Sequence, residues 1–305
     1  MSENEWVPDT REQFGQEKLR IISAVLNKIP ALSLSVRRII EMAGDKNVDS
    51  RELVEVASAD PVLASKILMM VNSSYYGLNR KIDNLRLAIV LLGFNEVRDI
   101  AIQLGFLQAV GQSKFKSMYD PKGLWTHSYL VSVCAETFSG DDDPKREGVL
   151  MTMGIMHDIG KFALSAIGEM MEKKGIKSAA VKDVNPDIPN LANEQNLFGV
   201  NHNIIGAMLV EKWNLSERAS DVIEYHHHPS YFSQDVIKTD YIEDIAIVCI
   251  SDSIVNRISG ENKNLREPAP FCYEVLGLNP SLDDLITPEL ETKIEKAREQ
   301  ANFLS

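Results

Sequence analysis

Two ionisable residues stand next to each other in an apolar stretch of this sequence. Residues 151–162 read MTMGIMHDIGKF, so His157 and Asp158 are surrounded by side chains typical of a protein interior. Burying a carboxylate without a partner costs several kcal/mol or forces the group to become neutral. The pair therefore predicts that further polar groups come close to it in the folded protein.

The other histidines lie in the same part of the chain, because all six fall between residues 127 and 228. His127, His202 and Asp252 each share a predicted helical face with apolar residues three, four or seven positions away. Each of these polar side chains is therefore expected to point inward, toward the interior that also contains the His157–Asp158 pair.

A run of three histidines follows a predicted helix that begins near Ser216. His226 and His227 fall in the last turn of that helix, from which their side chains can project about 100° apart. Pro229 disfavours the helical conformation for His228, which is therefore expected to be a flanking, more solvated residue.

A shared metal centre would satisfy these inward-pointing groups together. Imidazole and carboxylate without thiolate suit Zn, Fe, Mn, Ni or Co rather than Ca. The set exceeds the needs of one tetrahedral ion and suits two ions, roughly 3.5–4 Å apart, that share a carboxylate. Asp158 is the natural shared ligand because its neighbour His157 can bind one of the ions. The predicted ligands of one or two ions are His127, His157, Asp158, His202, His226, His227 and Asp252.

A simpler explanation exists for each member of this set taken alone. A single buried histidine is more often a core residue satisfied by an ordinary hydrogen bond than a metal ligand. An Asp–His hydrogen bond could also neutralise one pair without metal. The metal hypothesis is favoured because the same anomaly occurs on five separate predicted helices.

The elements that must position these residues are helical. Apolar residues recur three and four positions apart in stretches such as SVRRIIEMA, LASKILMMVN and NLRLAIVLLGF, whereas strand-like alternation is hard to find. Asp60 followed by Pro61 marks a helix start, as does Thr287 followed by Pro288. The sequence therefore predicts an all-α fold.

Three units are predicted along the chain. Residues 16–115 form an N-terminal helical subdomain, 120–260 form the unit with the candidate metal ligands, and 261–305 form a C-terminal helical extension. The turn-rich segment GQSKFKSMYDPKG separates the first two units. In the first unit, NSSYYG follows a helix and is interpreted as its cap, although such an aromatic and polar motif could instead contact a partner protein.

The composition predicts a globular protein of a reducing cytoplasm. No apolar run approaches the roughly 20 residues needed to span a bilayer, and no secretory signal is visible. The three cysteines are scattered without CxxC spacing, which argues against a disulfide framework. The net charge is −12 without a cluster of Lys or Arg, which argues against nucleic-acid binding but leaves room for a small anionic ligand.

Several segments resemble the HDOD (HD-related output domain) family of bacterial signalling proteins. They are LNKIPALSLSVRRII, ELVEVASADPVLASKILMMVNSSYYG, IDNLRLAIVLLGFNEVRDIAI, NEQNLFGVNHNIIGAMLVEKWNL and VIEYHHHP, and together they lie within about residues 18–257. The order H…HD…H…HH…D also resembles the wider HD superfamily of metal-dependent phosphohydrolases. The resemblance implies an HD-type helical domain behind a helical N-terminal subdomain, and a regulatory or output role in signal transduction.

The resemblance also implies how the ligands divide. HDOD proteins are often described as non-catalytic, and many have lost metal-binding residues, whereas every position of the HD-type ligand set is filled here. By position, one metal would be held by His127, His157, Asp158 and Asp252. The other would be held by Asp158, His202, His226 and His227.

A second comparison concerns catalysis. The related HD-GYP cyclic dinucleotide phosphodiesterases carry HHE…DGxGYP after their paired histidines, whereas this chain continues HHHPSYFSQD, which argues against cyclic di-GMP hydrolysis. Lys161 matches a lysine that reaches substrate phosphate in those enzymes, although it could equally be a solvated helix end. Asp158 and Lys161 are therefore the candidate catalytic residues.

Two classes of function follow from these observations. The first is a regulatory output protein that docks signalling proteins, and the resemblance favours it. The second is a phosphohydrolase in which metal ions activate water and neutralise phosphate charge. Iron would add a redox or ligand sensor as a third possibility. The expected partners are signalling proteins and a small phosphate-containing ligand, with no nucleic acid and no membrane, and the oligomeric state is left open.

Overall fold

The computed structural model describes residues 7–42, 50–73, 76–111, 119–139, 144–164, 167, 190–260 and 266–304. Within these ranges every regular element is an α-helix or a short 3-10 helix and none is a strand, which confirms the predicted all-α fold. None of the helices in this part of the chain is both long enough and apolar enough to cross a bilayer.

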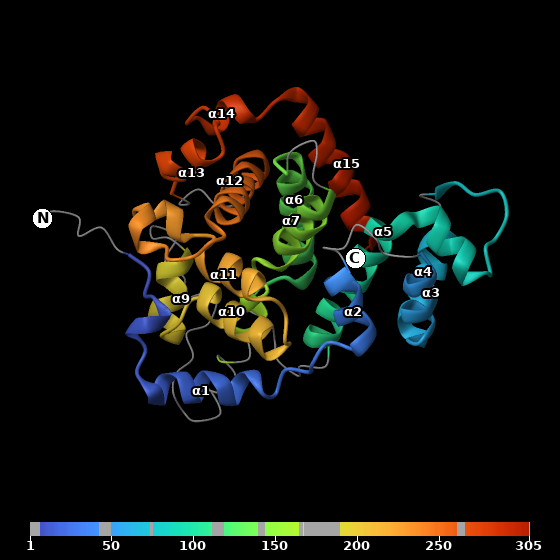
Figure 1. Ribbon diagram of the computed structural model, residues 1–305, viewed down its shortest axis with the longest axis horizontal. Coiled ribbons are helices and arrows are strands. Elements are labelled where there is room, and N and C mark those ends of the chain that lie inside the picture. Colours follow the sequence, from blue (N-terminus) through green and yellow to red (C-terminus); the bar gives the residue numbers. More distant parts are fainter. Residues whose placement is uncertain are drawn as a thin grey trace, which may run out of the picture.

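The N-terminal helices are the 3-10 helix η1 (Arg11–Gln13), α1 (Gln16–Leu26), α2 (Leu34–Met42), α3 (Ser50–Ser58), α4 (Pro61–Val71) and the long helix α5 (Leu85–Gly111). α2, α3 and α4 all pack against α5, and Figure 1 shows α3 and α4 at one side of the molecule. As predicted, α4 begins after Asp60, whose carboxylate accepts hydrogen bonds from the N–H groups of Val62 and Leu63, each at 3.1 Å.

α5 is interrupted at Gly93. This residue has φ 81° and ψ 169°, a conformation that side-chain-bearing residues rarely adopt, so two helical stretches meet there. The second stretch carries Arg98, which is fully buried and pairs with Asp99 at 2.9 Å. Arg98 also reaches the sulfur of Met151, at 3.0 Å, in α7 (Pro144–Met156). This stretch of α5 is thereby tied to a helix of the second unit.

The NSSYYG segment has a structural role at Asn72, the C-cap of α4. The Asn72 amide donates to the carbonyl oxygens of Leu68 at 2.8 Å and Ile82 at 2.6 Å, and its oxygen accepts from the Ile82 N–H at 2.7 Å. These bonds support the capping interpretation for Asn72. Ser74 and Tyr75 of the same segment lie outside the described residues.

The helices that carry or surround the candidate ligands form a second group. Besides α7 they are α6 (Pro121–Thr137), α9 (Asn190–Phe198), α10 (His202–Lys212), α11 (Glu217–Tyr225) and α12 (Ile242–Ser259), with the 3-10 helices η4 (His228–Ser230) and η5 (Gln234–Val236). α12 packs against α6, α7 and α11, and α10 packs against α11. α6 and α7 lie side by side (Figure 1), so close that a Cβ on Gly154 would lie 2.5 Å from the Cα of Ser132.

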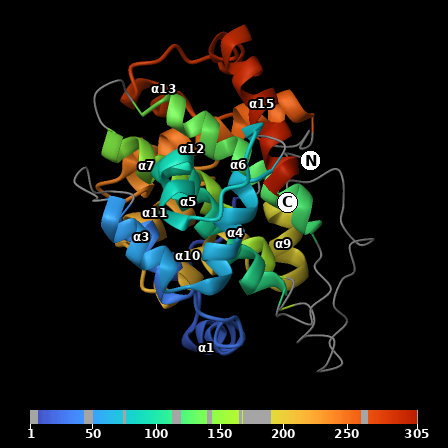
Figure 2. The ribbon, with the colours of Figure 1, turned by 90° about the vertical axis from the view of Figure 1, so that its right-hand side faces the viewer.

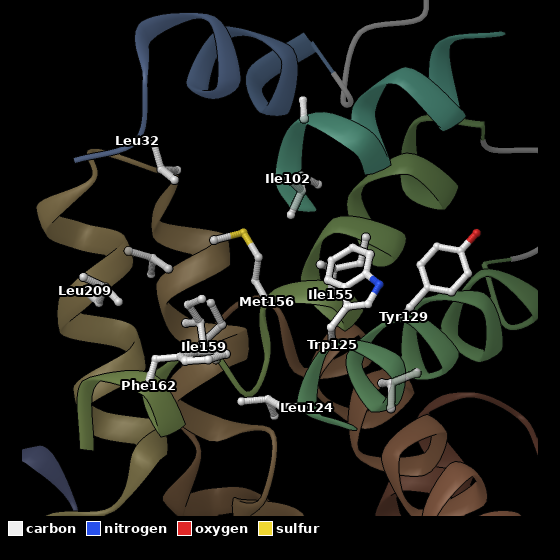
Figure 3. Packing of buried hydrophobic residues seen from close by; sticks show 14 of the residues in the cluster. Leu32, Ile102, Leu124, Trp125, Tyr129, Ile155, Met156, Ile159, Phe162 and Leu209 are labelled. Atoms are coloured by element: carbon white, nitrogen blue, oxygen red, sulfur yellow. The ribbon is translucent and has the colours of Figure 1, made fainter. Parts of the chain in front are cut away.

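Apolar packing holds the segment around the His157–Asp158 pair. Met156 and Ile159, on either side of the pair, are buried members of the main hydrophobic core. The same core includes Leu209 of α10 and Trp125 of α6, and Figure 3 draws Met156 and Ile159 between these two side chains. The backbone that carries the pair is therefore held in place by the buried side chains on either side of it.

The C-terminal helices close the other end of the molecule. They are α13 (Pro270–Val275), α14 (Leu282–Leu285) and α15 (Pro288–Leu304). α13 and α1 lie at opposite ends in both views (Figures 1 and 2). α15 packs along α6, where Lys293 pairs with Glu136 at 2.6 Å. The sequence did not predict where this extension packs. In the structure, its helix α15 packs against α6. The boundaries of the three units, at 16–115, 120–260 and 261–305, stay a prediction.

Candidate metal centre

The His157–Asp158 pair lies directly after the last residue of α7. Both side chains are buried, with at most 1% of either exposed. His157 Nδ1 lies 2.7 Å from the carbonyl oxygen of Gly154, three residues earlier. Because a carbonyl can only accept, Nδ1 carries the proton, and Nε2 of the neutral ring is left with a free lone pair.

The other predicted ligands come from four further places in the fold. His127 lies within α6 and Asp252 within α12, His202 is the first residue of α10, and His226 and His227 directly follow α11. The structure brings all of them together around Asp158. Each of these seven side chains is at most 9% exposed: His127, His157, Asp158, His202, His226, His227 and Asp252.

One group of ligand atoms lies on the Oδ2 side of Asp158. This oxygen is 3.4 Å from His157 Nε2 and 3.8 Å from His127 Nε2. Asp252 lies at the edge of the group, with Oδ1 3.0 Å from His127 Nε2 and 3.9 Å from His157 Nε2. Asn256 fixes this carboxylate by donating to Oδ1 at 2.6 Å.

A second group lies on the Oδ1 side of the same carboxylate. Oδ1 is 3.1 Å from His202 Nε2. The His202 ring centroid is 5.2 Å from that of His227, which is itself 4.1 Å from that of His226. One donor atom from each of Asp158, His202, His226 and His227 lies within 4.8 Å of the others. Asp158 is thus common to both groups, with one oxygen directed to each.

The arrangement fits a metal centre better than an ordinary polar core. Two atoms that bind one ion at about 2.0–2.2 Å lie roughly 3–4.4 Å apart, which is the range of the contacts around Asp158. The Nε2 atoms of His157 and His226 are buried and have no hydrogen-bond partner among the described residues. Buried polar atoms are seldom left unsatisfied. The hydrogen bond between His127 and Asp252 is the simpler pairing considered from the sequence, but it satisfies only one histidine.

Two of the imidazoles have lowered pKa values, which favours the neutral form that binds metal. Burial, together with the neighbouring imidazoles, lowers the pKa of His226 well below its usual value. Burial likewise lowers the pKa of His227 to about 3. Both rings are therefore neutral near pH 7, the form in which imidazole binds a metal. His226 Nδ1 is 2.7 Å from the carbonyl oxygen of Ile223, which leaves Nε2 facing the cluster.

Two other imidazoles face carboxylates and hold protons more strongly. Burial alone would lower the pKa of His157, but the negative charge of Asp158 outweighs burial and raises it. For His202 the Glu194 and Asp158 carboxylates outweigh burial and raise the pKa to about 9. A cation bound at these nitrogens would take the place of those protons.

Lys161 is not the solvated helix end considered from the sequence. Its side chain is 17% exposed, and its ammonium lies 2.5 Å from Asp158 Oδ2. Burial would raise the pKa of Asp158, but the Lys161 charge, with that of His157, holds it well below the usual value. Lys161 therefore places a positive charge at the edge of the cluster, and a contact with substrate phosphate stays a prediction.

Glu194 of α9 is a part of the site that the sequence analysis missed. It is 1% exposed and accepts from His202 Nδ1, with oxygens at 2.7 and 2.9 Å, and from the His202 N–H at 2.8 Å. The Tyr119 hydroxyl donates to the same carboxylate at 2.7 Å. The available signal was that Glu194 shares a helical face with Leu191, Leu197 and Phe198, three or four positions away. Its partner, however, depends on how α9 packs near the start of α10.

Glu194→Ala should weaken metal binding by about 10- to 100-fold, as is usual when a carboxylate that orients a metal-binding histidine is removed. The His202 ring would lose the bonds that direct Nε2 to Asp158. Competition of Zn²⁺ with a chromophoric chelator measures the change. Glu55→Ala, which removes an exposed acid of α3, serves as the control. Equal affinities in the two variants would contradict a positioning role for Glu194.

His228 corrects another expectation. It was predicted to be flanking and solvated, yet it is only 2% exposed, between Tyr225 and Phe232 at ring-centroid distances of 4.8 and 4.9 Å. Burial lowers its pKa to about 4. The backbone expectation is also wrong, because His228 is the first residue of the 3-10 helix η4 in spite of Pro229. His228 packs beside the cluster and is not among its grouped ligand atoms.

Comparisons with known proteins agree with this fold. An HDOD domain protein of Geobacter sulfurreducens aligns with 95% of this chain and 99% of its own, with TM-score 0.65 and 21% identity. A Marinobacter aquaeolei protein, provisionally described as a signal transduction protein, gives TM-score 0.71 and 19% identity over 94% of this chain and 66% of its own. A Shewanella amazonensis protein, provisionally described as a metal-dependent phosphohydrolase, gives TM-score 0.55 and 15% identity over 94% of this chain and 100% of its own.

The sequence comparisons identify the family. An uncharacterised protein of Treponema pallidum (strain Nichols) is 22% identical over 237 residues, which are 77% of this chain and 43% of that protein. The chain therefore spans less than half the length of this relative. The HDOD domain model matches residues 29–229, about two thirds of the sequence. This range includes six of the seven predicted metal ligands, all except Asp252. The chain belongs to the HDOD family.

Proposed function

We propose that this chain is a regulatory output protein of bacterial signal transduction whose HD-like core binds one or two divalent transition-metal ions. Membership of the HDOD family and the likeness to the Marinobacter aquaeolei protein support the signalling part. The metal part rests on one observation above all. Histidines from separate helices surround a single buried carboxylate, and the buried Nε2 atoms of His157 and His226 have no hydrogen-bond partner in the part of the chain that the structure describes.

The residues divide between two ions as the family resemblance implies. One ion would be held by His127, His157 and Asp158, with Asp252 beside them. The other would be held by Asp158, His202, His226 and His227. Imidazole and carboxylate ligands without thiolate favour Fe, Mn, Zn or Ni. Signalling proteins and a small phosphate-containing molecule are the proposed partners.

Elemental analysis tests the metal part. Purified protein should contain transition metal, and the double variant His157→Ala with Asp158→Ala should lose it, because it lacks the shared carboxylate and an adjacent ligand. His228→Leu removes a buried histidine outside the grouped ligand atoms and should keep the metal. Stoichiometric metal in the double variant would refute the ligand assignment.

A metal-dependent phosphohydrolase is the second candidate, favoured by the position of Lys161. Its ammonium lies beside Asp158 Oδ2 and its side chain is 17% exposed, so an incoming phosphate could meet a positive charge next to the candidate metal ligands. Bound ions would activate water and neutralise charge on the phosphate. Here Lys161 would bind and orient the phosphate, while Glu194 would keep the His202 ring in place.

A panel of phosphomonoesters, nucleotides and cyclic dinucleotides, with Mn²⁺ or Fe²⁺ added, tests this second function. Turnover that Asp158→Ala abolishes, and that Lys161→Ala weakens mainly through a higher KM, would establish the enzyme. The KM effect is expected because Lys161 would contact substrate. The absence of turnover across the panel would leave the output protein as the function.

A further inference from the structure

A cavity of about 300 Å³ lies between α2, α7 and the beginning of α11. None of the candidate metal ligands lines it. Its walls are Ile40 and Glu41 of α2, Val149, Thr152, Met153 and Met156 of α7, and Asn214, Leu215, Ser216, Arg218 and Ala219 at the start of α11. The volume reaches the lower end of the range typical of small-molecule sites, which often lie where separate structural units meet.

Most of the wall is apolar and adaptable. The α7 residues are spaced three, four and seven positions apart, so they form one face of that helix. Met153 and Met156 on this face are buried, and unbranched thioether side chains adjust readily to the shape of a ligand. Leu215 and Ala219 face them from α11 and Ile40 from α2. Such a surface favours an apolar ligand.

The charged groups at the cavity already have partners. Arg218 Nε donates to Asp244 Oδ2 at 2.6 Å. Glu41 pairs with Arg38 at 3.4 Å. An ionic ligand would therefore meet no uncompensated charge of opposite sign, and it would lose hydration on entering. The cavity thus disfavours anions and cations alike.

Two hydroxyl groups define the polar part of the ligand. The Thr152 hydroxyl donates to the Gly148 carbonyl oxygen at 2.9 Å, so its lone pairs can still accept. Ser216 Oγ accepts from the Ala219 N–H at 3.2 Å, so its proton can still be donated. Asn214 adds an amide that can donate or accept, so the uncharged polar side chains of the wall suit a single hydroxyl group.

We propose that this cavity binds a neutral, mainly apolar small molecule carrying one hydroxyl group. Two of the helices that line the cavity, α7 and α11, continue directly into residues of the histidine cluster. Met156 directly precedes His157, and Ala219 lies on the helix whose C-cap is His226, about 10.5 Å further along at 1.5 Å per residue. Occupation of the cavity changes the position of both histidines, and ion binding in turn changes affinity for the small molecule.

Methyl-carbon NMR of the methionines tests binding without any metal, in chelator-treated full-length protein. The probes are 1-hexanol, hexanoate and hexylammonium, which share a chain and differ in the head group. The Met153 and Met156 signals, assigned with Met→Leu variants, should shift saturably with 1-hexanol, and both ions should bind at least tenfold more weakly. Met69, which is 60% exposed on α4, should not respond.

Substitutions locate the binding. Val149→Trp places bulk into the cavity from a partly exposed position and should abolish the response, whereas Val90→Trp, at a 64% exposed valine of α5, should leave it intact. Circular dichroism checks folding, and Ala219→Leu replaces Val149→Trp if the latter does not fold. The proposal is overturned by equal responses to all three probes, by no saturable shift, or by wild-type binding in the cavity-filling variant.

The coupling rests on the proposed function and has its own measurement. Saturating 1-hexanol should change the Kd for Zn²⁺ by at least about fivefold. Unchanged Zn²⁺ affinity would overturn the coupling. Alcohol binding by a protein that takes up no transition metal would support the cavity site and refute the metal centre, so the two failures are distinguishable.

Discussion

Asp158→Ala should remove every bound ion, whereas His127→Ala and His227→Ala should each remove one of two. Asp158 alone belongs to both groups of ligand atoms, with Oδ1 directed to His202 and Oδ2 to His157. The measurement is metal per chain after saturation with Zn²⁺ and gel filtration. The expected values are two ions in the unsubstituted protein, close to none in Asp158→Ala and one in each histidine variant.

The control for this series is Asp235→Ala, which removes an exposed aspartate of η5 and should leave the metal content unchanged. If Asp158→Ala kept as many ions as His127→Ala, the shared-carboxylate arrangement would be wrong even if the protein binds metal. Identical losses from His127→Ala and His227→Ala, both to zero, would instead indicate a single ion held by the whole cluster.

Gly160→Ala should destabilise the protein by more than about 3 kcal/mol and displace His202 from the cluster. A Cβ at this position would lie 1.9 Å from the His202 carbonyl oxygen and 2.7 Å from the Gly206 nitrogen. Both are backbone atoms of α10, which cannot turn away as a side chain can. The free energy of unfolding, from urea titration of the metal-free protein, measures the effect.

Gly15→Ala is the matched control for this substitution. A Cβ there would meet nothing within 4 Å, and the residue has φ −66°, so alanine fits. Its cost should stay below about 1 kcal/mol, the usual range for changes at an N-cap. Similar unfolding free energies for the two variants would show that the contact between the HDIGK segment and α10 is looser than described.

The inward faces of the helices were predictable from the sequence because helical geometry alone sets them. His127, His202 and Asp252 share faces with apolar neighbours, and each is buried in the structure. The Lys161 contact with Asp158 follows the same rule, since residues three apart on a helical turn are neighbours. From the sequence, Lys161 is expected to be a phosphate contact or a solvated helix end; its pairing with Asp158 comes from the structure.

Features that depend on how distant helices meet were not predictable in this way. Glu194 and Tyr119 are 75 residues apart, and their hydrogen bond needs α9 to approach the start of α6. The burial of His228 likewise depends on η4 packing against α12, which lies further along the chain. The cavity is assembled from three helices, and the first of them, α2, ends about a hundred residues before α7 begins and about 175 before α11 begins.

The backbone hydrogen bonds of His157 and His226 have a thermodynamic consequence. Each ring is anchored through Nδ1 to the carbonyl oxygen three residues earlier, at 2.7 Å. Rotational entropy of these side chains is therefore lost when the chain folds and not when an ion arrives. Ion uptake at such preorganised ligands needs little rearrangement, and the ion-free protein should keep its helical content. This behaviour contrasts with that of zinc fingers, whose folding depends on the ion.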